Sequence, residues 1–280
     1  MYTTIGVLSG KGGVGKTTIV SNLGIALAKN FNRESIIVDG NIRNSHLGLH
    51  FGLYEDLPYT IIDVLRHNIP VSKAIYIHTD SGLRLLPSSL SGGEVSLHRL
   101  NHLIMALKKV YDLILVDFPP GLGKETISAI RSVDTALIVT TPELPSVSDA
   151  LKTINILRRL KKDVKGIIIN RYRNVKYELS TEEIESTCNL NVLAELPDER
   201  RMAECIAKGI PIVLDKPRTD FSRRINRLAT LILGKEYMPD GFLEKLKRIF
   251  SGKKIQSAEY EKPFVPLNST LKDKAKMARI

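Results

Sequence analysis

The segment SGKGGVGKTT, residues 9–18, combines four glycines with two lysines and two threonines. Gly10, Gly15, Lys16 and Thr17 match the pattern G-x-x-x-x-G-K-[ST], after a β-branched apolar run and before a helical pattern. Glycines in such a turn let backbone N–H groups converge on phosphate oxygens, and the start of a helix adds a positive field. The pattern therefore predicts a phosphate-binding loop made of Gly10, Lys11, Gly12, Gly13, Val14, Gly15, Lys16, Thr17 and Thr18.

Three residues have predicted roles in phosphoryl chemistry. Lys16 bridges the β- and γ-phosphates of ATP, and the hydroxyl of Thr17 is a ligand of Mg²⁺. Such a loop needs a metal-organising carboxylate at the end of a neighbouring strand, and Asp117 follows the apolar run of residues 113–116. The alternative role for Asp117 is a strand-end cap. Two prolines and Gly121 come next and indicate a shaped switch loop, in which the N–H of Gly121 approaches the γ-phosphate.

The elements that must position these residues alternate along the chain. Short apolar, β-branched runs predict buried parallel strands at 3–9, 34–40, 111–118, 134–141 and 164–170. Helical patterns cover 17–29, 94–109, 146–161 and 219–233. This alternation predicts a three-layer α/β/α fold of the P-loop NTPase class, with a mostly parallel sheet and helices on both faces.

Composition favours one large domain with a polar tail. The chain has 280 residues, 43% of them hydrophobic, and a formal net charge of +11, which favours anionic partners. Its two cysteines, Cys188 and Cys205, have neither the spacing nor the neighbours of a disulfide framework or a zinc site. The start resembles no signal peptide and no run is long enough to span a membrane, so we expect a cytoplasmic protein.

The loop KGGVGKT, residues 11–17, resembles the hallmark of the MinD/ParA family of deviant-Walker-A P-loop ATPases, and the chain is most like the MinD branch. In that family the early lysine, here Lys11, reaches the nucleotide of a second subunit. The resemblance therefore implies an ATP-dependent homodimer, in which Lys11 supplies charge compensation in trans. Without a partner, Lys11 is simply a solvated loop lysine.

Five further segments carry the resemblance, which covers about residues 2–234. Residues 38–53 resemble switch I, 116–122 resemble switch II, and 140–153 resemble the dimer-facing segment of MinD. The family's adenine-binding positions fall on Asn170 and the neighbouring Arg171, and on Pro197 and Asp198 within a predicted loop, 195–202. From the residues alone, Asn170 reads equally well as a turn former at a strand end.

One departure affects hydrolysis. Where the family has D-x-D, this chain has Asp39, Gly40 and Asn41. We expect Asp39 to contact metal-bound water and Asn41 to position the attacking water without accepting its proton. The prediction is a slow, dimerisation-dependent ATPase; the alternative is a nucleotide-binding adaptor with little hydrolysis.

Residues 240–252 predict an amphipathic helix. At roughly 100° per residue, its apolar side chains share one arc and its lysines and arginine lie on the other side. It resembles the membrane-targeting helix of MinD, with Phe242, Leu243, Leu246, Ile249 and Phe250 as the membrane-binding residues. The alternative is a last helix packed on the domain. Residues 253–280 predict a flexible polar tail, although Phe264 and Val265 between prolines can also dock on the body.

These features together predict an ATPase that attaches to the inner face of the cell membrane and positions division or polar machinery. Its partners are an anionic membrane surface and an unidentified activator or cargo protein. The competing interpretation is a ParA-like partition ATPase that binds DNA through basic clusters. These clusters contain Arg158, Arg159, Lys161, Lys162 and Lys165, and Arg218, Arg223, Arg224 and Arg227.

Overall fold

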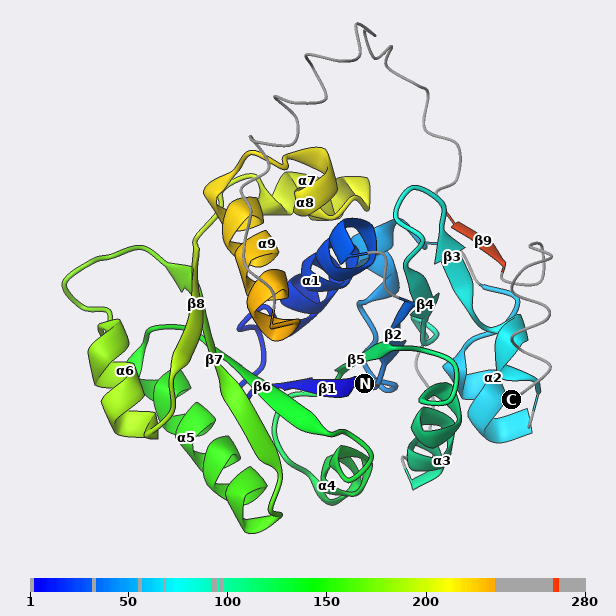
Figure 1. Ribbon diagram of the computed structural model, residues 1–280, viewed down its shortest axis with the longest axis horizontal. Coiled ribbons are helices and arrows are strands. Elements are labelled where there is room, and N and C mark those ends of the chain that lie inside the picture. Colours follow the sequence, from blue (N-terminus) through cyan, green and yellow to red (C-terminus); the bar gives the residue numbers. More distant parts are fainter. Residues whose placement is uncertain are drawn as a thin grey trace, which may run out of the picture.

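One sheet of nine strands, in the order β8-β7-β6-β1-β5-β2-β4-β3-β9, runs through the described part of the chain (Figure 1). The computed structural model describes residues 3–31, 34–54, 57–67, 69–91, 95, 98–234 and 264–266. The strands are β1 (Thr3–Leu8), β2 (Ser35–Asp39), β3 (Tyr76–His78), β4 (Arg84–Leu86), β5 (Leu113–Asp117), β6 (Thr135–Thr140), β7 (Asp163–Tyr172), β8 (Val192–Pro197) and β9 (Phe264–Pro266). Strands β8 to β4 pair in parallel, whereas β3 is antiparallel to both β4 and β9.

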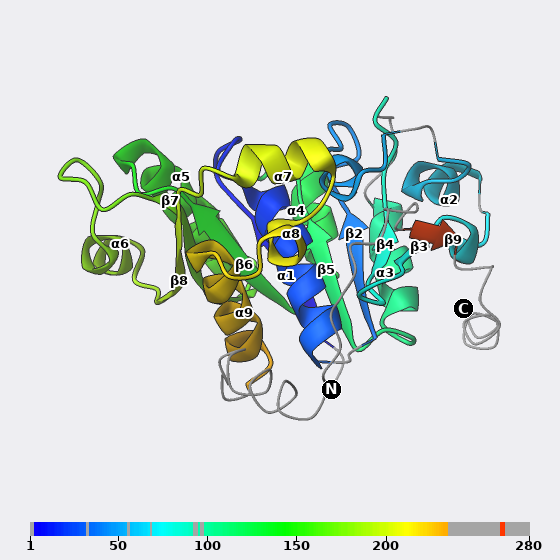
Figure 2. The same ribbon diagram turned by 90° about the horizontal axis from the view of Figure 1, so that it is seen from above.

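Helices cover both faces of this sheet (Figures 1 and 2). The helices are α1 (Lys16–Phe31), α2 (Ile61–His67), α3 (His98–Leu107), α4 (Lys124–Ile130), α5 (Leu144–Arg159), α6 (Thr181–Cys188), α7 (Met202–Lys208), α8 (Ile212–Asp215) and α9 (Asp220–Ile232), with the 3-10 turns η1 (Gly48–Phe51) and η2 (Val71–Lys73). One buried cluster joins the sheet to α1, α8 and α9, and a second joins it to α2 through α6. The predicted three-layer α/β/α fold is confirmed.

The central strands are apolar because both of their faces are buried. Every residue of β2, β5 and β6 is buried, and so are all but the first residue of β1. Alternating inward and outward polarity is absent from such strands because helices on each side exclude water. The repeated runs of Ile, Leu and Val in the sequence are therefore the direct cause of the layered arrangement.

The parallel register brings the ends of three strands to one edge. Asp39, the last residue of β2, pairs with Asp117, the last residue of β5, and Val7 of β1 is on the other side of Asp117. The loop from β1 to α1 leaves from the same edge. Neighbouring strands β5 and β6 flank β1, and the crevice beyond the carboxyl ends of such strands is the usual ligand site of an open α/β sheet.

The five predicted strands and four predicted helices are all present, with ends shifted by a few residues. The predicted helix 94–109 is seen as α3 from His98, and three of its first residues lie outside the described part. The expected loop 195–202 is wrong in its first third, because β8 extends through Pro197 beside β7. Short elements such as β3, β4 and α2 have too few residues for a clear periodic pattern.

The amphipathic helix predicted at 240–252 lies outside the described residues, as do its membrane-binding residues Phe242, Leu243, Leu246, Ile249 and Phe250. The predicted polar tail, 253–280, is described only at 264–266, which form β9. These three residues pair with β3, and the flexibility of the tail stays a prediction. Within the described ranges no helix has the length and apolar character to cross a membrane.

Candidate functional site

The phosphate loop lies between β1 and α1, as its pattern predicts. Gly13 and Gly15 have φ angles of +78° and +91°, a region that other residues rarely adopt. Helix α1 begins at Lys16, so the free N–H groups of its first turn lie directly after the loop. The hydroxyl of Ser9 donates to the carbonyl oxygen of Lys11 over 2.7 Å, which closes the loop at its start.

Gly10 allows the loop to lie against α5. A Cβ atom at this position would be only 2.2 Å from the carbonyl oxygen of Asp149 and 2.3 Å from its carbonyl carbon. Both are backbone atoms of a helix, so no side-chain rotation relieves the overlap. The glycine is required here for close approach, whereas a Cβ atom at Gly12 would meet nothing nearer than Pro120, at 3.9 Å.

Asp117 and Thr17 form the candidate metal centre. The Thr17 hydroxyl donates to Oδ2 of Asp117 over 2.6 Å. The second oxygen, Oδ1, is buried and has no hydrogen-bond partner among the described residues. An orphaned buried carboxylate oxygen beside a threonine hydroxyl fits Mg²⁺, which is commonly held by one or two protein oxygens together with phosphate and water. The donor set therefore suits the predicted metal.

Asp39 and Asp117 are both completely buried and close enough to influence each other electrostatically. Burial, and then the charge of Asp117, raise the pKa of Asp39 to about 7. Burial also raises the pKa of Asp117, while Lys16 and the bond from Thr17 oppose that shift. The pKa of Lys16 is lowered by burial, against the pull of Asp117. The site is thus a buried cluster of two carboxyl groups and one amine that responds strongly to added charge.

The loop after β2 is organised by Asp39. Its Oδ1 accepts from the backbone N–H of Asn41 over 3.0 Å, and its Oδ2 accepts from the hydroxyl of Ser45. The Asn41 side chain donates through Nδ2 to the carbonyl of Asn44 over 2.7 Å. That bond orients the amide and leaves Oδ1 of Asn41 as the atom that can accept from water. Sequence reasoning missed Ser45, although a serine within switch I was the available signal.

The loop after β5 contacts the phosphate loop itself. The N–H of Gly121 donates to the carbonyl of Ser9 over 2.9 Å, and Gly121 has a φ angle of +74°. This N–H therefore reaches a phosphate only if the bond to Ser9 opens. The predicted contact of Gly121 with the γ-phosphate stays a prediction.

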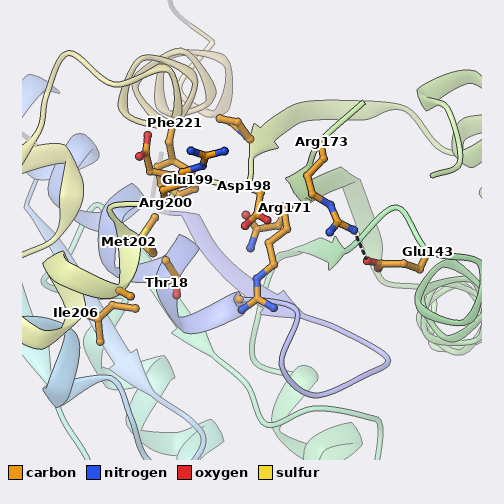
Figure 3. Close-up of a pocket in the computed structure, with 14 residues that line it drawn as sticks. Thr18, Glu143, Arg171, Arg173, Asp198, Glu199, Arg200, Met202, Ile206 and Phe221 are labelled. Carbon is orange, nitrogen blue, oxygen red and sulfur yellow. Dashed lines mark ion pairs between the residues drawn. The ribbon is translucent and has the colours of Figure 1, made fainter. Parts of the chain in front are cut away.

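Next to the loop is a pocket of about 500 Å³ (Figure 3). Its volume is in the range of small-molecule sites. Gly15 and Thr18 form the end nearest the phosphate loop, and α7 contributes Met202 and Ile206. The remaining lining residues come from the N-cap of α5, the end of β7 and the residue after it, the end of β8 and the turn that follows, α7 and α9: Glu143, Asn170, Arg171, Arg173, Pro197, Asp198, Glu199, Arg200, Ala203 and Phe221. The predicted adenine residues are thus gathered in one pocket.

Asn170 connects this pocket to the phosphate loop. It is buried, and its Nδ2 donates to the carbonyl of Val14 over 2.8 Å. A Cβ atom on Gly15 would be 2.2 Å from the same nitrogen, so the glycine makes room for the asparagine. The role of Asn170 in binding adenine stays a prediction, and fastening the phosphate loop is a role that the sequence did not reveal.

An irregularity in the pairing of β7 with β8 orients the residues that line the pocket. The pairing of β7 with β8 shifts register between Ile169 and Tyr172, and Arg171 between them has a φ angle of +57°. Left-handed backbone at a residue other than glycine costs free energy and is concentrated at functional sites. The N–H of Asp198 then donates to the carbonyl of Tyr172 over 3.1 Å, which places the turn after β8 beside the pocket.

Many basic residues proposed for DNA binding have structural partners. Arg158 donates to the carbonyls of Cys188 and Asn189, and Lys162 donates to those of Arg131 and Val133. Arg224 contacts Asp220 and Glu195, and Arg223 contacts Asp220. These four of the nine residues in the clusters thus have partners within the fold, while most of the nine side chains are exposed. Both cysteines of the chain are free and buried.

Comparison with known proteins agrees with this geometry. A model of the ParA group, described as NUBPL iron-transfer P-loop NTPase, matches residues 1–233. An uncharacterised ATP-binding protein of Methanocaldococcus jannaschii is 36% identical over 259 residues, which are 91% of this chain and 96% of that protein. The septum site-determining protein MinD of Thermotoga maritima is 33% identical over 269 residues, 90% of this chain and 98% of its own.

A solved structure matches the same range. The septum site-determining protein MinD of Pyrococcus horikoshii, complexed with Mg-ADP, is 29% identical and has a TM-score of 0.76. The match covers 90% of this chain and 100% of that chain. That relative binds the ligand class for which the orphaned oxygen of Asp117 is suited.

We predict that Gly10→Ala destabilises the protein, whereas Gly12→Ala is the matched control. The added methyl group at position 10 overlaps backbone atoms of α5, and we expect a loss of about 1–3 kcal/mol in the free energy of unfolding. The control adds the same group in open space and changes this free energy by less than about 0.5 kcal/mol. Urea unfolding without nucleotide measures both. Equal stability of the two variants would show that the loop does not press on α5.

We predict that Asp39→Asn stabilises the metal-free protein at pH 8 and much less at pH 4. The unfolded chain loses the Asp39 proton near its ordinary pKa of 3.8, whereas the folded protein keeps it until about pH 7. The folded state therefore binds more protons in this window, and stability falls as the pH rises from about 4 to about 7. The neutral amide removes this loss, worth on the order of 2–4 kcal/mol at 1.4 kcal/mol per pKa unit.

Chemical unfolding at a series of pH values tests this expectation. Asp80→Asn is the control, because this aspartate is exposed and lies outside the site. If Asp39→Asn and Asp80→Asn shifted the pH profile equally, the electrostatic description of the carboxyl pair would be wrong.

Proposed function

Because the chain belongs to the ParA family of P-loop NTPases, as its motifs predicted, we propose that it is a MinD-like ATPase. It binds Mg-ATP, pairs with a second copy through the nucleotide and attaches to the inner face of the cell membrane. There it positions division or polar machinery with the help of an activator or cargo protein. The proposed ATPase activity rests on the arrangement of Lys16, Thr17 and Asp117. One oxygen of Asp117 has no hydrogen-bond partner among the described residues.

Hydrolysis follows from positioning and charge. Lys16 would compensate charge on the transferred phosphate, Thr17 and Asp117 would hold the metal, and Asp39 would contact water bound to it. The metal supplies further neutralisation of phosphate charge. Asn41 orients the attacking water through Oδ1, because its Nδ2 is engaged by Asn44. An amide cannot take up the proton of that water, so turnover is slow.

Pairing of two copies is supported by the surface beside the loop. Lys11 is exposed, and the neighbouring Gly10 packs on α5. Leu144, at the start of α5, is 67% exposed, and Tyr177 is 73% exposed. The loop that carries Tyr177 is fastened to this region by the bond from Leu179 N–H to the carbonyl of Pro142. Exposed apolar side chains of this size suit an interface with a second copy.

Membrane attachment is supported by the amphipathic pattern at 240–252 and by the net charge of +11. One helix of this length binds lipid weakly, so two copies on one dimer bind better than one. Iron transfer, the role in the family description, has less support. Both cysteines are buried, and the described residues hold no group of three or more His, Cys, Asp or Glu side chains that suits a metal.

We predict that Lys11→Ala binds ATP with little change but no longer dimerises. The lysine contributes charge only across the dimer, whereas Lys16 contacts the phosphates of its own subunit. Sedimentation velocity with a non-hydrolysable ATP analogue reports the dimer, and turnover of ATP falls in parallel. Lys16→Ala serves as the comparison, because it loses nucleotide binding itself. A Lys11→Ala variant that dimerises and hydrolyses like the wild type would rule out action in trans.

We predict that more protein sediments with liposomes containing phosphatidylglycerol in the presence of ATP than in the presence of ADP. The double variant Phe242→Glu/Phe250→Glu should lose this difference, because it places two charges on the apolar face of the helix. Ser251→Glu/Ser257→Glu adds the same two charges elsewhere and should retain more binding. Equal pelleting of wild type and double phenylalanine variant with both nucleotides would refute the membrane switch. Stimulation of turnover by plasmid DNA instead of lipid would favour the partition ATPase.

A further inference from the structure

The C-terminal strand β9 completes the sheet on the side of switch I. Residues 264–266 pair antiparallel with β3, with Phe264 opposite His78, Val265 opposite Ile77 and Pro266 opposite Tyr76. In the described part of the chain, β3 would otherwise present an unpaired strand edge. Addition of a short extended segment to such an edge is a common mode of peptide recognition. Here the segment belongs to the chain itself.

Phe264 gives this pairing its side-chain anchor. It is 9% exposed and belongs to the buried cluster on the α1 side of the sheet. Its ring is 5.5 Å from that of Phe51 at 80°, and 5.0 Å from that of His78 at 73°. Such edge-to-face contacts are favourable beyond simple burial. We call Phe51 and His78 the aromatic socket.

The aromatic socket is continuous with the nucleotide-binding region. Phe51 is the last residue of η1, and this turn directly follows the loop that Asp39 holds through Asn41 and Ser45. The N–H of His50 donates to the carbonyl of Leu47, so the loop and the turn form one hydrogen-bonded unit. Hydrogen bonds and the chain itself therefore connect the loop at Asp39 to Phe51.

The hydrogen-bonded unit of loop and turn also contacts the pocket next to the phosphate loop. Just after η1, the hydroxyl of Tyr54 donates to the carbonyl of Ala207 over 3.0 Å. Gly52 and Gly209 are packed so closely that a Cβ atom on Gly209 would be 2.3 Å from the Cα of Gly52. Ala207 belongs to α7, which lines the pocket through Met202 and Ile206. Residues 48–54 thus join the carboxyl cluster, the pocket and the aromatic socket.

We propose that residues 264–266 are an intramolecular latch on switch I, docked in the same chain that carries the socket. Both Asp39 oxygens are engaged by the loop, so metal-bound water competes with Ser45 and Asn41 for that carboxylate. The docked latch holds residues 48–51 in the arrangement in which Asn41 and Ser45 donate to Asp39. It thereby weakens binding of the Mg-nucleotide. By linkage, nucleotide binding weakens the latch by the same factor. This regulatory role rests on the proposed nucleotide-binding function.

A disulfide between the paired strands tests the latch directly. Ile77 and Val265 are register partners, and paired residues of antiparallel strands have the Cα spacing that a disulfide needs. In the full-length Ile77→Cys/Val265→Cys variant we expect oxidation to link the two positions within one chain. The oxidised protein should bind Mg-ADP about 3- to 10-fold more weakly than the reduced protein, within the usual range of coupling. Each single-cysteine variant is the control for oxidation alone.

Phe264→Ala provides the opposite perturbation. Loss of the ring should increase hydrogen exchange in the peptide that contains residues 76–78 and tighten Mg-ADP binding about 3- to 10-fold. Tyr260→Ala removes an aromatic ring from the same region of the sequence and should leave both quantities unchanged. Phe51→Ala combined with Phe264→Ala should give less than the sum of the two single effects, because each variant already removes the shared contact.

The outcomes separate the latch from the proposed function. Unchanged exchange at 76–78 in Phe264→Ala, or no cross-link, would overturn the docking. A cross-link between two chains would assign the socket to a second copy and refute the intramolecular latch. Equal affinities of oxidised and reduced protein would refute the coupling to switch I. Failure of the wild type to bind Mg-ADP would contradict the proposed function instead, since exchange and cross-linking are measured without nucleotide.

Discussion

The burial of Asp39 and Asp117 side by side is the constraint on which the rest of the site depends. Parallel pairing of β2 with β5 puts the two carboxyl groups at one register position, and apolar layers on both sides remove water from them. Two such groups cannot both ionise cheaply in a dry environment. The amine of Lys16 offsets part of this cost, and one oxygen of Asp117 remains without a donor. A cation bound beside this carboxyl pair would therefore stabilise its ionised form.

Three other parts of the fold hold the phosphate loop in place. Asn170 bonds to Val14 from β7, α5 packs on Gly10, and Gly121 bonds to Ser9 from the loop after β5. The first contact is made by the side-chain amide of Asn170, the second by a glycine that leaves no space for a side chain, and the third by backbone atoms alone. Preorganised N–H groups are effective in phosphate binding because the free energy of ordering them is spent in folding.

The loop after Asp39 extends this organisation toward the edge of the sheet. Its hydrogen bonds lead from the carboxyl cluster to η1, and Phe51 of that turn packs on Phe264 of β9. A segment far away in the sequence is thus in mechanical contact with the switch. In a packed core such contacts tend to have discrete arrangements rather than a continuous range, which suits regulation.

Local patterns in the sequence were sufficient for the layered fold and for the place of the phosphate loop between β1 and α1, whereas the roles of Lys16, Thr17 and Asp117 stay predictions. Apolar runs and helical periodicity act within a few neighbouring residues, and the loop motif is contiguous, so no long-range information is needed. The sequence could not indicate that Asn170 fastens Val14, that Asp149 requires Gly10, or that Phe264 docks on Phe51. Only tertiary structure decides these contacts, because each joins residues more than 100 positions apart through packing that no local pattern encodes.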